Sequence, residues 1–347
     1  RMSTPYNGGG YEPYPEHPEG SHPENGPGNY GENYDAFDVN TAASMAGATA
    51  LRFHGEQLTD NVPGDGVSPH PINDPASNGW FHVKGDGKLN VLEAIGWGLK
   101  ATFSNAKLWI PLGIVYTLVA VAGQFLPGFG AVIAAAGSIL LASWMAGVAL
   151  QQTLSQRLTF NDAKAPAFGK TVGVAALLGV FGTIAFALLI MALAFGALST
   201  VDPSTLPDST ENVSAEEMWA FVRPLLGALG ISFLIALLVA PFLTFQLWYA
   251  ADNNGSFGHA MGAGFKAGAS NYLRIMGFIV LLALINIVGA ALLVIGLIVT
   301  LPGSMLVGAA LLVIGLIVTL PGTMLASAHA YRQISGGPVP KDAVATA

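Results

Sequence analysis

The chain has 347 residues, of which 52% are apolar and only 10% are charged, against about a quarter charged in an average soluble domain. With a mean hydropathy of +0.54 and 43 glycines, this composition is typical of a polytopic membrane protein. No cysteine is present, which excludes disulfides, thiolate metal sites, iron–sulfur clusters and thiol catalysis.

The first 88 residues differ in charge from the rest of the chain. They carry twelve acidic and four basic residues, so the remainder is close to neutral. Residues 1–37 mix Pro, Gly, Tyr and Glu and contain no Leu, Ile or Val, and such a segment cannot bury enough apolar surface to offset chain ordering. We therefore predict a disordered, acidic cytoplasmic tail and linker over residues 1–88. Its acidity argues against nucleic-acid binding, which needs clustered Lys and Arg.

The tail contains a glycine-rich segment and several histidines, but neither has the residue spacing of a phosphate-binding loop or a metal site. Lys84-Gly-Asp-Gly-Lys88 contains two glycines but not the rest of a phosphate-binding loop, and no strand is expected before it. It is predicted to be a turn. The histidines of the tail follow no metal-ligand pattern and are interpreted as ordinary linker residues: His17, His22, His54, His70 and His82.

A twelve-residue pattern occurs twice, at residues 94–105 (AIGWGLKATFSN) and 260–271 (AMGAGFKAGASN), and each copy leads into a long apolar run. Apolar residues at spacings of three and four predict a short amphipathic helix in each copy. We expect both helices to lie on the membrane surface, with the equivalent Lys100 and Lys266 meeting anionic headgroups. Burial of the same helices inside the protein is the alternative.

Six apolar runs of membrane-crossing length follow. They cover about residues 108–126, 129–151, 172–198, 224–250, 273–299 and 304–331. The predicted fold is an all-α membrane protein of about six transmembrane helices with two short juxtamembrane amphipathic helices. This membrane domain is expected to occupy residues 89–337, followed by a short cytoplasmic tail over residues 338–347.

Lys and Arg in the connections predict the orientation, because positive residues are retained on the cytoplasmic side. The opposite set of connections holds only Arg223, in an acidic loop from Ser199 to Arg223 where Ser214 and Glu217 predict a helix-starting capping box. Both termini are therefore expected in the cytoplasm of a multi-pass protein of the inner (plasma) membrane. The other set holds nine cations: Lys100, Lys107, Arg157, Lys164, Lys170, Lys266, Arg274, Arg332 and Lys341.

A second, nearly perfect repeat lies at residues 289–307 and 308–326. Nineteen helical residues rise about 28 Å, close to one hydrocarbon thickness, so the extra copy has the length of a whole crossing. An odd number of spans would place Arg332 and Lys341 outside, against the charge rule. Six long, tilted spans with Pro321 kinking the last are therefore expected, and a seven-span or re-entrant arrangement is the alternative.

The predicted spans contain no Asp, Glu, Lys or Arg except near their ends, whereas ion-coupled transporters usually keep one near the midplane. No recognised catalytic or nucleotide-binding motif occurs, so the sequence predicts a protein that is not an enzyme, with no cofactor and no metal site. Asn286 and His329 are the buried polar candidates, with a structural role favoured for His329. Six residues are expected to contact the membrane surface or lipid headgroups: Lys100, Lys107, Lys266, Arg274, Trp109 and Trp248.

Three segments carry a resemblance to known proteins: residues 87–113 (GKLNVLEAIGWGLKATFSNAKLWIPLG), residues 252–278 (DNNGSFGHAMGAGFKAGASNYLRIMGF) and residues 319–337 (TLPGTMLASAHAYRQISGG). They resemble uncharacterised actinobacterial polytopic integral membrane proteins with a Pro/Gly/Tyr-rich cytoplasmic tail. They are also similar to the membrane domain associated with some glycerophosphoryl diester phosphodiesterases, although this chain has no phosphodiesterase domain. The resemblance spans about residues 89–337, implies an inner-membrane protein of a Gram-positive lineage, and transfers no active site.

Two functions from different classes are open at this point. The favoured one is a non-catalytic scaffold or accessory subunit that binds another membrane or cell-envelope complex, because the tail and the glycine-rich packing faces suit partners and no chemistry is evident. Dense small residues in 128–147 and 173–182 also fit a homo-oligomer. The alternative is a channel or carrier for a neutral or lipidic solute. A lipid-directed enzyme has only the phosphodiesterase association behind it.

Overall fold

The computed structural model describes residues 52–53, 56–57, 80–122, 129–165, 167–201, 214–253, 255–300 and 305–342. Of these, residues 52–53, 56–57, 81, 84, 121–122, 288–300, 305–316 and 342 are described by their backbone alone. Most of the predicted disordered tail therefore lies outside the described residues. Within it, β1 (Arg52–Phe53) and β2 (Glu56–Gln57) pair antiparallel. From residue 80 onward the described chain is mostly helical.

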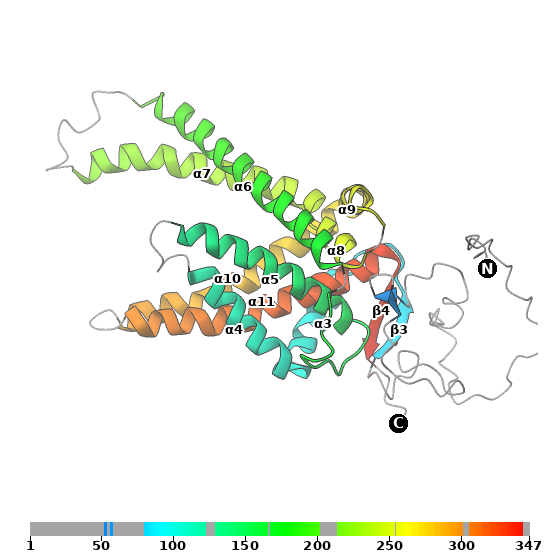
Figure 1. Cartoon of the computed structure of the whole chain (residues 1–347). Coiled ribbons are helices and arrows are strands. Elements are labelled where there is room, and N and C mark those ends of the chain that lie inside the picture. The colour runs from blue at the N-terminus through cyan, green and yellow to red at the C-terminus, as the bar shows by residue number, and fades with distance from the viewer. Residues whose placement is uncertain are drawn as a thin grey trace, which may run out of the picture. The chain divides into compact units, whose positions relative to one another are not determined.

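The elements from residue 80 onward run in the following order (Figure 1). They are β3 (Trp80–Lys84), α3 (Val91–Ser104), α4 (Ala106–Ala122), α5 (Gly130–Gln152), α6 (Phe168–Leu198), α7 (Ala215–Leu243), α8 (Gln246–Ala251), α9 (Phe257–Ser270), α10 (Tyr272–Thr300), α11 (Met305–Ser335) and β4 (Pro338–Asp342).

Within the described residues, three helices are long and apolar enough to cross a membrane: Gly130–Gln152, Phe168–Leu198 and Ala215–Ala251. Two further candidates are bent pairs, α3 with α4 at 101° and α9 with α10 at 93°, which raise the number to five if each pair is one span. The last expected span, residues 304–331, falls on α11, whose first twelve residues are described by backbone alone. The structure is thus that of a helical protein with three to five candidate spans.

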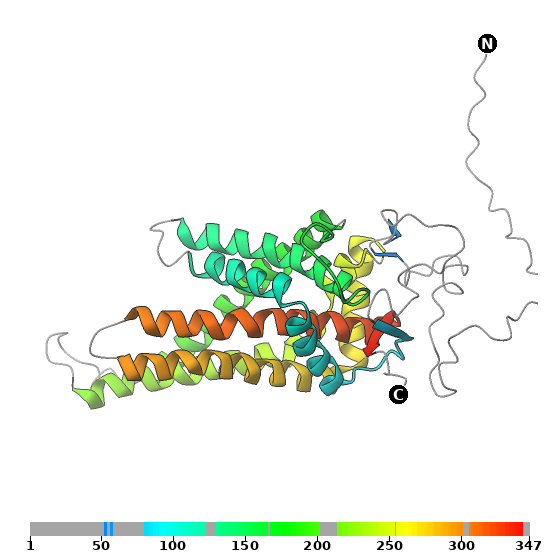
Figure 2. The same cartoon turned by 90° about the horizontal axis from the view of Figure 1, so that it is seen from below.

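Helices α10 and α11 lie side by side, and α3 and α4 both pack on α11 (Figure 1, Figure 2). Helices α6 and α7 form a hairpin whose outer half extends away from the other helices in Figure 1. Only Thr171 and Val174 of α6 are buried as a result. Large apolar side chains along this helix, including Phe181, Met191 and Phe195, are exposed.

The twelve-residue repeat folds as α3 and α9, and one glycine that recurs in both copies packs against another helix. Gly98 faces α11, where an added Cβ would lie 2.4 Å from the backbone nitrogen of Ala326. The equivalent Gly264 faces α8, where an added Cβ would lie 2.6 Å from the nitrogen of Gln246. Small residues are retained because they let two backbones approach closely. Each repeat helix therefore packs by its small face, the alternative weighed above.

The opposite sides of these two helices remain exposed. Leu92 and Phe103 of α3 and Phe257 and Phe265 of α9 are exposed apolar residues. Ile95, three residues after Leu92 in α3, is buried. The location of the exposed sides at a membrane surface stays a prediction.

The nineteen-residue repeat takes two different structures. Its first copy, residues 289–307, contains the end of α10 and the start of α11, with residues 301–304 outside the described part. Its second copy, residues 308–326, lies wholly inside α11 and carries Pro321 within the helix. At most four residues separate α10 from α11, which leaves no room for an additional spanning helix between them.

Helix α4 packs over the position in α11 where Pro321 removes a backbone hydrogen bond. Proline has no backbone N–H, so the carbonyl of Ile317, four residues earlier, receives no hydrogen bond from it. A Cβ built on Gly113 of α4 would lie 2.3 Å from that oxygen. Glycine at this position therefore lets the α4 backbone pack directly over the carbonyl, where Cα–H groups are weak donors.

Strands β3 and β4 pair antiparallel, with Trp80 opposite Asp342 and Lys84 opposite Pro338. Both segments lie in regions expected to be tails, and the pairing brings them together; the expected limits of 89 and 337 for the membrane domain stay a prediction. Strand β3 corrects the expectation that no strand precedes Lys84-Gly-Asp-Gly-Lys88. The pairing joins segments more than 250 residues apart, and β4 contains two prolines, which a strand tolerates at a sheet edge.

Candidate functional site

Polar contacts gather where the two bends, the β3–β4 ribbon and the end of α11 meet. The asparagines that end the repeat helices, Asn105 and Asn271, close each helix and tie the bend to another segment. Asn105 Nδ2 donates to Gln152 Oε1 at 2.9 Å and to the Leu158 carbonyl at 2.8 Å. Asn271 Oδ1 accepts from the backbone N–H of Leu89 at 3.2 Å. The repeated asparagines therefore fix the angle at which α4 and α10 leave.

Gln152, at the end of α5, is fully buried and uses its whole side chain in hydrogen bonds. Its Oε1 accepts from Asn105 and from Trp109 Nε1 at 3.1 Å, and its Nε2 donates to the carbonyls of Ser155 and Gln156. Its backbone carbonyl accepts from Trp80 Nε1 at 3.0 Å. A buried polar group with every partner satisfied holds a structure together and offers nothing to a substrate.

A buried ion pair joins Arg332 of α11 to Asp252, which follows α8. Their side chains are 1% and 5% exposed, with Nη1 and Oδ1 3.1 Å apart. Tyr331 Oη donates to the second carboxylate oxygen at 2.8 Å, and Arg332 Nε donates to Thr153 Oγ1 at 3.0 Å. Burial raises the pKa of Asp252, while Arg332 and the Tyr331 hydroxyl act against that rise.

His82 of β3 lies against the same group of residues. It is buried, and its Nε2 is 2.9 Å from the carbonyl of Thr153. The pKa of His82 is lowered to about 4, mainly by burial and also by the nearby Arg332 charge, whereas the Thr153 carbonyl opposes the change. The sequence placed His82 in a linker; the structure makes it a neutral, structural residue of the ribbon.

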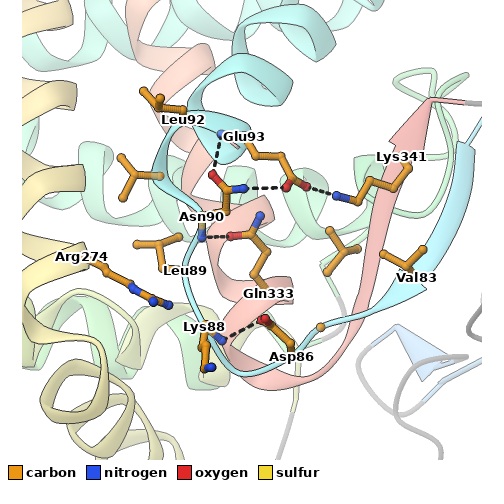
Figure 3. A pocket seen from close by; sticks show the side chains of 13 residues that line it. Val83, Asp86, Lys88, Leu89, Asn90, Leu92, Glu93, Arg274, Gln333 and Lys341 are labelled. Carbon is orange, nitrogen blue, oxygen red and sulfur yellow. Dashed lines mark hydrogen bonds and ion pairs between the residues drawn. The ribbon is translucent and has the colours of Figure 1, made fainter. Parts of the chain in front are cut away.

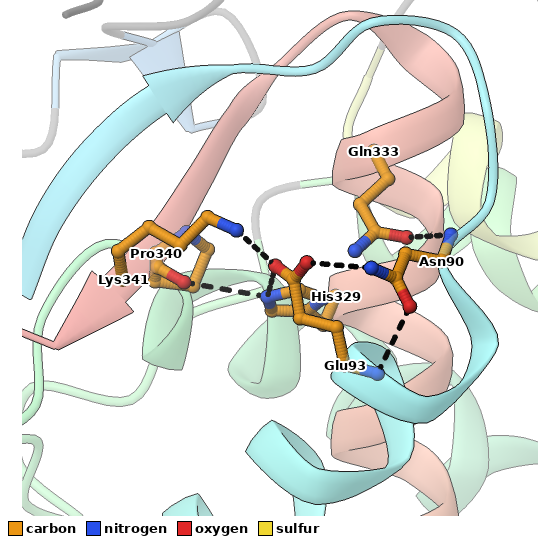
Figure 4. A network of polar contacts seen from close by, with 6 residues as sticks. All are labelled: Asn90, Glu93, His329, Gln333, Pro340 and Lys341. Carbon is orange, nitrogen blue, oxygen red and sulfur yellow. Dashed lines mark hydrogen bonds and ion pairs between the residues drawn. The ribbon is translucent and has the colours of Figure 1, made fainter. Parts of the chain in front are cut away.

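His329 lies at the centre of a second network, drawn in Figure 4. It is fully buried, and its Nε2 is 3.3 Å from the Pro340 carbonyl and 3.7 Å from Glu93 Oε1. Its ring is tilted against that of Trp97, with the ring centroids 5.0 Å apart. Glu93 also accepts from Asn90 Nδ2 and pairs with Lys341. Among the described residues, His329 Nδ1 and Trp97 Nε1 have no hydrogen-bond partner.

A pocket of about 600 Å³ opens beside this network, between the turn after β3, the start of α3, the start of α10 and the ribbon (Figure 3). Its charged lining residues are Asp86, Lys88, Glu93, Arg274 and Lys341. Apolar residues, among them Leu89 and Leu92, complete the wall. The described residues contain no group of three or more His, Asp or Glu side chains arranged to hold a metal. The pocket therefore suits a charged ligand held by cations and hydrogen bonds.

The structure places the expected headgroup-contact residues in two classes. Lys100, Lys107, Lys266 and Arg274 are exposed, and Arg274 lines the pocket. Trp109 and Trp248 are 0% and 4% exposed, so their side chains are buried rather than placed at the membrane surface as expected. Trp109 packs inward because its Nε1 finds Gln152; tryptophans near span ends serve buried contacts as readily as interfacial ones.

The two buried polar candidates are far from equivalent. Asn286 of α10 is half-buried, and its Nδ2 donates to the Leu282 carbonyl at 2.8 Å and to Thr323 Oγ1 of α11 at 3.1 Å. It joins two helices, as interhelical amides commonly do in membrane bundles. His329 belongs to the network beside the pocket. Its burial and its contacts suit the structural role favoured above.

Several residues of these networks are not recognisable from the sequence. From the sequence, Arg332 is indistinguishable from an exposed cation in a loop, yet it is buried and paired with Asp252. The only signal is position, since Arg332 and Asp252 each follow the end of an apolar run. Glu93 and Gln333 carry no signal beyond helix-terminal placement.

A scan against models of known protein families, a search among curated proteins and a search among solved structures each found no match.

Proposed function

We propose that this protein is a non-catalytic scaffold or accessory subunit of the plasma membrane that binds another membrane or cell-envelope complex. The α6–α7 hairpin carries the proposal. It exposes large apolar side chains along its outer half, and α6 buries only two residues against the rest of the described chain. A helix with so little internal packing gains stability from lipid or from a neighbouring subunit.

The polar networks support the same conclusion from the other end of the molecule. The side chains of Gln152 and Arg332 form hydrogen bonds with other residues of this chain. These two buried side chains are thus engaged in holding α5, α11 and the ribbon together. This arrangement gives a rigid base from which the hairpin projects.

The proposed membrane arrangement has six spans, α4, α5, α6, α7, α10 and α11, with α3 and α9 lying at the cytoplasmic surface. Support comes from the 101° and 93° bends, which turn the repeat helices away from the spans they precede. Further support comes from nine cations in one set of connections against one in the other. Both termini then lie in the cytoplasm.

The test is affinity purification after gentle detergent extraction and crosslinking, with identification of whatever co-elutes. Gly182 of α6 has nothing within 4 Å of an added Cβ, so Gly182→Leu leaves this chain's own packing intact while adding bulk to the exposed face. We expect specific partners with the native protein and reduced recovery with Gly182→Leu. Recovery of the native protein alone would overturn the scaffold proposal; equal recovery with both would move the partner away from α6.

A channel or carrier for a neutral or lipidic solute is the second candidate. The observation favouring it is the pair of sharply bent helices, because transporters build substrate sites from broken helices related by an internal repeat. Purified protein reconstituted in vesicles is the test. Flux of lipid analogues or small neutral solutes that depends on the protein would favour this function over the scaffold.

A further inference from the structure

We propose that the pocket between the β3–α3 turn and the start of α10 binds the phosphate group of an anionic membrane lipid. The inference rests on insertion of α10 in the bilayer, as proposed above, and not on the scaffold role. No sequence motif marks this site, because the strand before the turn has no local sequence signal.

The pocket is built before any ligand arrives, because its turn is tied down at several points. The N–H groups of Gly85 and Gly87 donate to the carbonyls of Gly337 and Gln333 at 2.9 and 3.0 Å. Asn271 at the α9–α10 bend donates to the Gly87 carbonyl at 3.0 Å. Gly87 has φ of +81°, a conformation that a side chain would strain. A ligand therefore meets a fixed wall and loses little free energy in ordering it.

Two of the cations that line the pocket, Lys88 and Arg274, are not paired with its acidic residues. Both carboxylate oxygens of Glu93 are occupied, by Lys341 and by Asn90, and Asp86 accepts the backbone N–H of Lys88. Among the described residues, no hydrogen bond or ion pair engages Lys88 Nζ or the Arg274 guanidinium. In Figure 3 these two side chains project on the side of the pocket away from Glu93. A planar guanidinium and an ammonium together are the usual partners of a phosphate.

Neutral donors add to the cations. Val91 and Leu92 begin α3 and line the pocket, and first-turn N–H groups of a helix lie outside its hydrogen-bond ladder, at the positive end of the dipole. The Gln333 side chain is 95% buried and lines the pocket; its Oε1 accepts from the N–H of Asn90, while its Nε2 has no partner within the described residues. Donors thus outnumber free acceptors, as an anion requires.

The location of the pocket at the start of α10 favours a lipid phosphate over a free phosphate ion as its ligand. Arg274 is the third residue of α10, directly after the 93° bend, where the proposed span enters the headgroup layer. Leu92 at the pocket and Leu273 beside Arg274 are 75% and 80% exposed. Exposed leucines next to a cationic pocket suit acyl chains below a phosphate, the pattern expected for anionic-lipid sites between membrane helices.

The experiment measures lipid retained by the purified full chain in nanodiscs of phosphatidylcholine containing a small fraction of phosphatidylglycerol, read by native mass spectrometry. The variant is Lys88→Gln with Arg274→Gln. The matched control, Arg157→Gln with Lys164→Gln, removes the same charge from exposed positions outside the pocket. We expect roughly tenfold weaker phosphatidylglycerol retention in the pocket variant and little change in the control. An equal loss of phosphatidylglycerol retention in the pocket variant and the control would show that general surface charge causes the effect, and would overturn the proposed site.

Inorganic phosphate separates the two possible sources. In lipid-free detergent, binding of phosphate alone at micromolar concentration, abolished by the pocket variant, would assign the site to a soluble anion and overturn the lipid proposal. Alkaline extraction of native membranes reports insertion independently. A protein that stays in the membrane but shows no phosphatidylglycerol preference contradicts the pocket inference alone, whereas release of the protein contradicts the membrane arrangement itself.

Discussion

At the scale of single residues, the buried Arg332–Asp252 pair makes the largest prediction. Replacing Asp252 by Asn leaves the guanidinium buried without a counter-charge, and breaking one partner of such a pair costs about 3–5 kcal/mol. The double variant Asp252→Leu with Arg332→Met should recover most of that loss, because no uncompensated charge remains. The measurement is thermal unfolding in detergent.

The exposed Arg157 supplies the control for this pair. Arg157→Met removes the same charge and should change the melting temperature little, as isolated surface charges contribute little. A double variant as unstable as Asp252→Asn would show that the pair is held by more than charge compensation.

His82 gives a pH-dependent prediction. Its pKa is about 4 in the folded protein and about 6.5 when unfolded, so the unfolded chain binds the extra proton between these values. The stability due to neutral His82 is complete above pH 6.5 and is lost as pH falls toward 4, by roughly 3 kcal/mol in total.

His82→Gln should flatten this dependence, because the amide keeps a donor for the Thr153 carbonyl without titrating in the window. Melting temperatures of both proteins from pH 7.5 to 4.5 check the prediction. Parallel curves would assign the acid sensitivity to another group.

A residue-scale prediction that depends only on local chemistry is confirmed. The capping box of Ser214 and Glu217 is confirmed, with both reciprocal hydrogen bonds present at the start of α7, because all its atoms lie within four residues. The burial of Trp109 and the pairing of Arg332 depend on partners 43 and 80 residues away. Nothing near either residue in the chain indicates those partners.

At the scale of elements, the packing face of α3 can be tested with two glycines that are neighbours on the helix. Gly98→Ala places a Cβ 2.4 Å from the α11 backbone, whereas Gly96 has nothing within 4 Å. Gly98→Ala should destabilise the protein by about 1–3 kcal/mol. Gly96→Ala should be neutral or stabilising by up to about 1 kcal/mol, because alanine favours a helix.

The corresponding pair in α9, Gly264→Ala and Gly262→Ala, should repeat this difference, since Gly264 faces α8 and Gly262 faces open space. Melting temperatures of the four variants, compared in one detergent, provide the measurement. Similar values for Gly98→Ala and Gly96→Ala would contradict close packing of α3 on α11.

Helices were predictable where the spacing of apolar residues or the length of an apolar run indicated them. Both copies of the twelve-residue pattern fold as helices, at α3 and α9, and α6 ends at Leu198 as its apolar run indicated. The β3–β4 ribbon was not predictable, because strand pairing across more than 250 residues leaves no local signal and Pro338 and Pro340 disfavour a strand. The nineteen-residue repeat shows the same limit, since nearly identical residues end one helix and lie inside another.

At the scale of the whole molecule, the arrangement in the membrane is testable because the chain contains no cysteine. Lys164→Cys and Glu216→Cys replace exposed residues on either side of α6. We expect a membrane-impermeant thiol reagent added to intact cells to label Glu216→Cys, and to label Lys164→Cys only after the membrane is opened.

Arg157→Cys, in the same connection as Lys164, should behave as Lys164→Cys does. Labelling of positions 164 and 216 from one side would show that α6 does not cross the bilayer and would remove the basis for six spans. The class of the protein and its helices follow from composition, whereas the number of crossings depends on how the two bent pairs sit in lipid. Amino-acid patterns alone do not determine that placement.

The contact between α3 and α11 has a consequence for biosynthesis. About 230 residues separate the ends of these two helices along the chain. At a translation rate of about 5–20 residues per second, α3 leaves the ribosome roughly 10–50 s before its partner exists. During that interval its glycine face has no helix to meet, so the nascent chain depends on the insertion machinery or on the lipid surface until the last helix arrives.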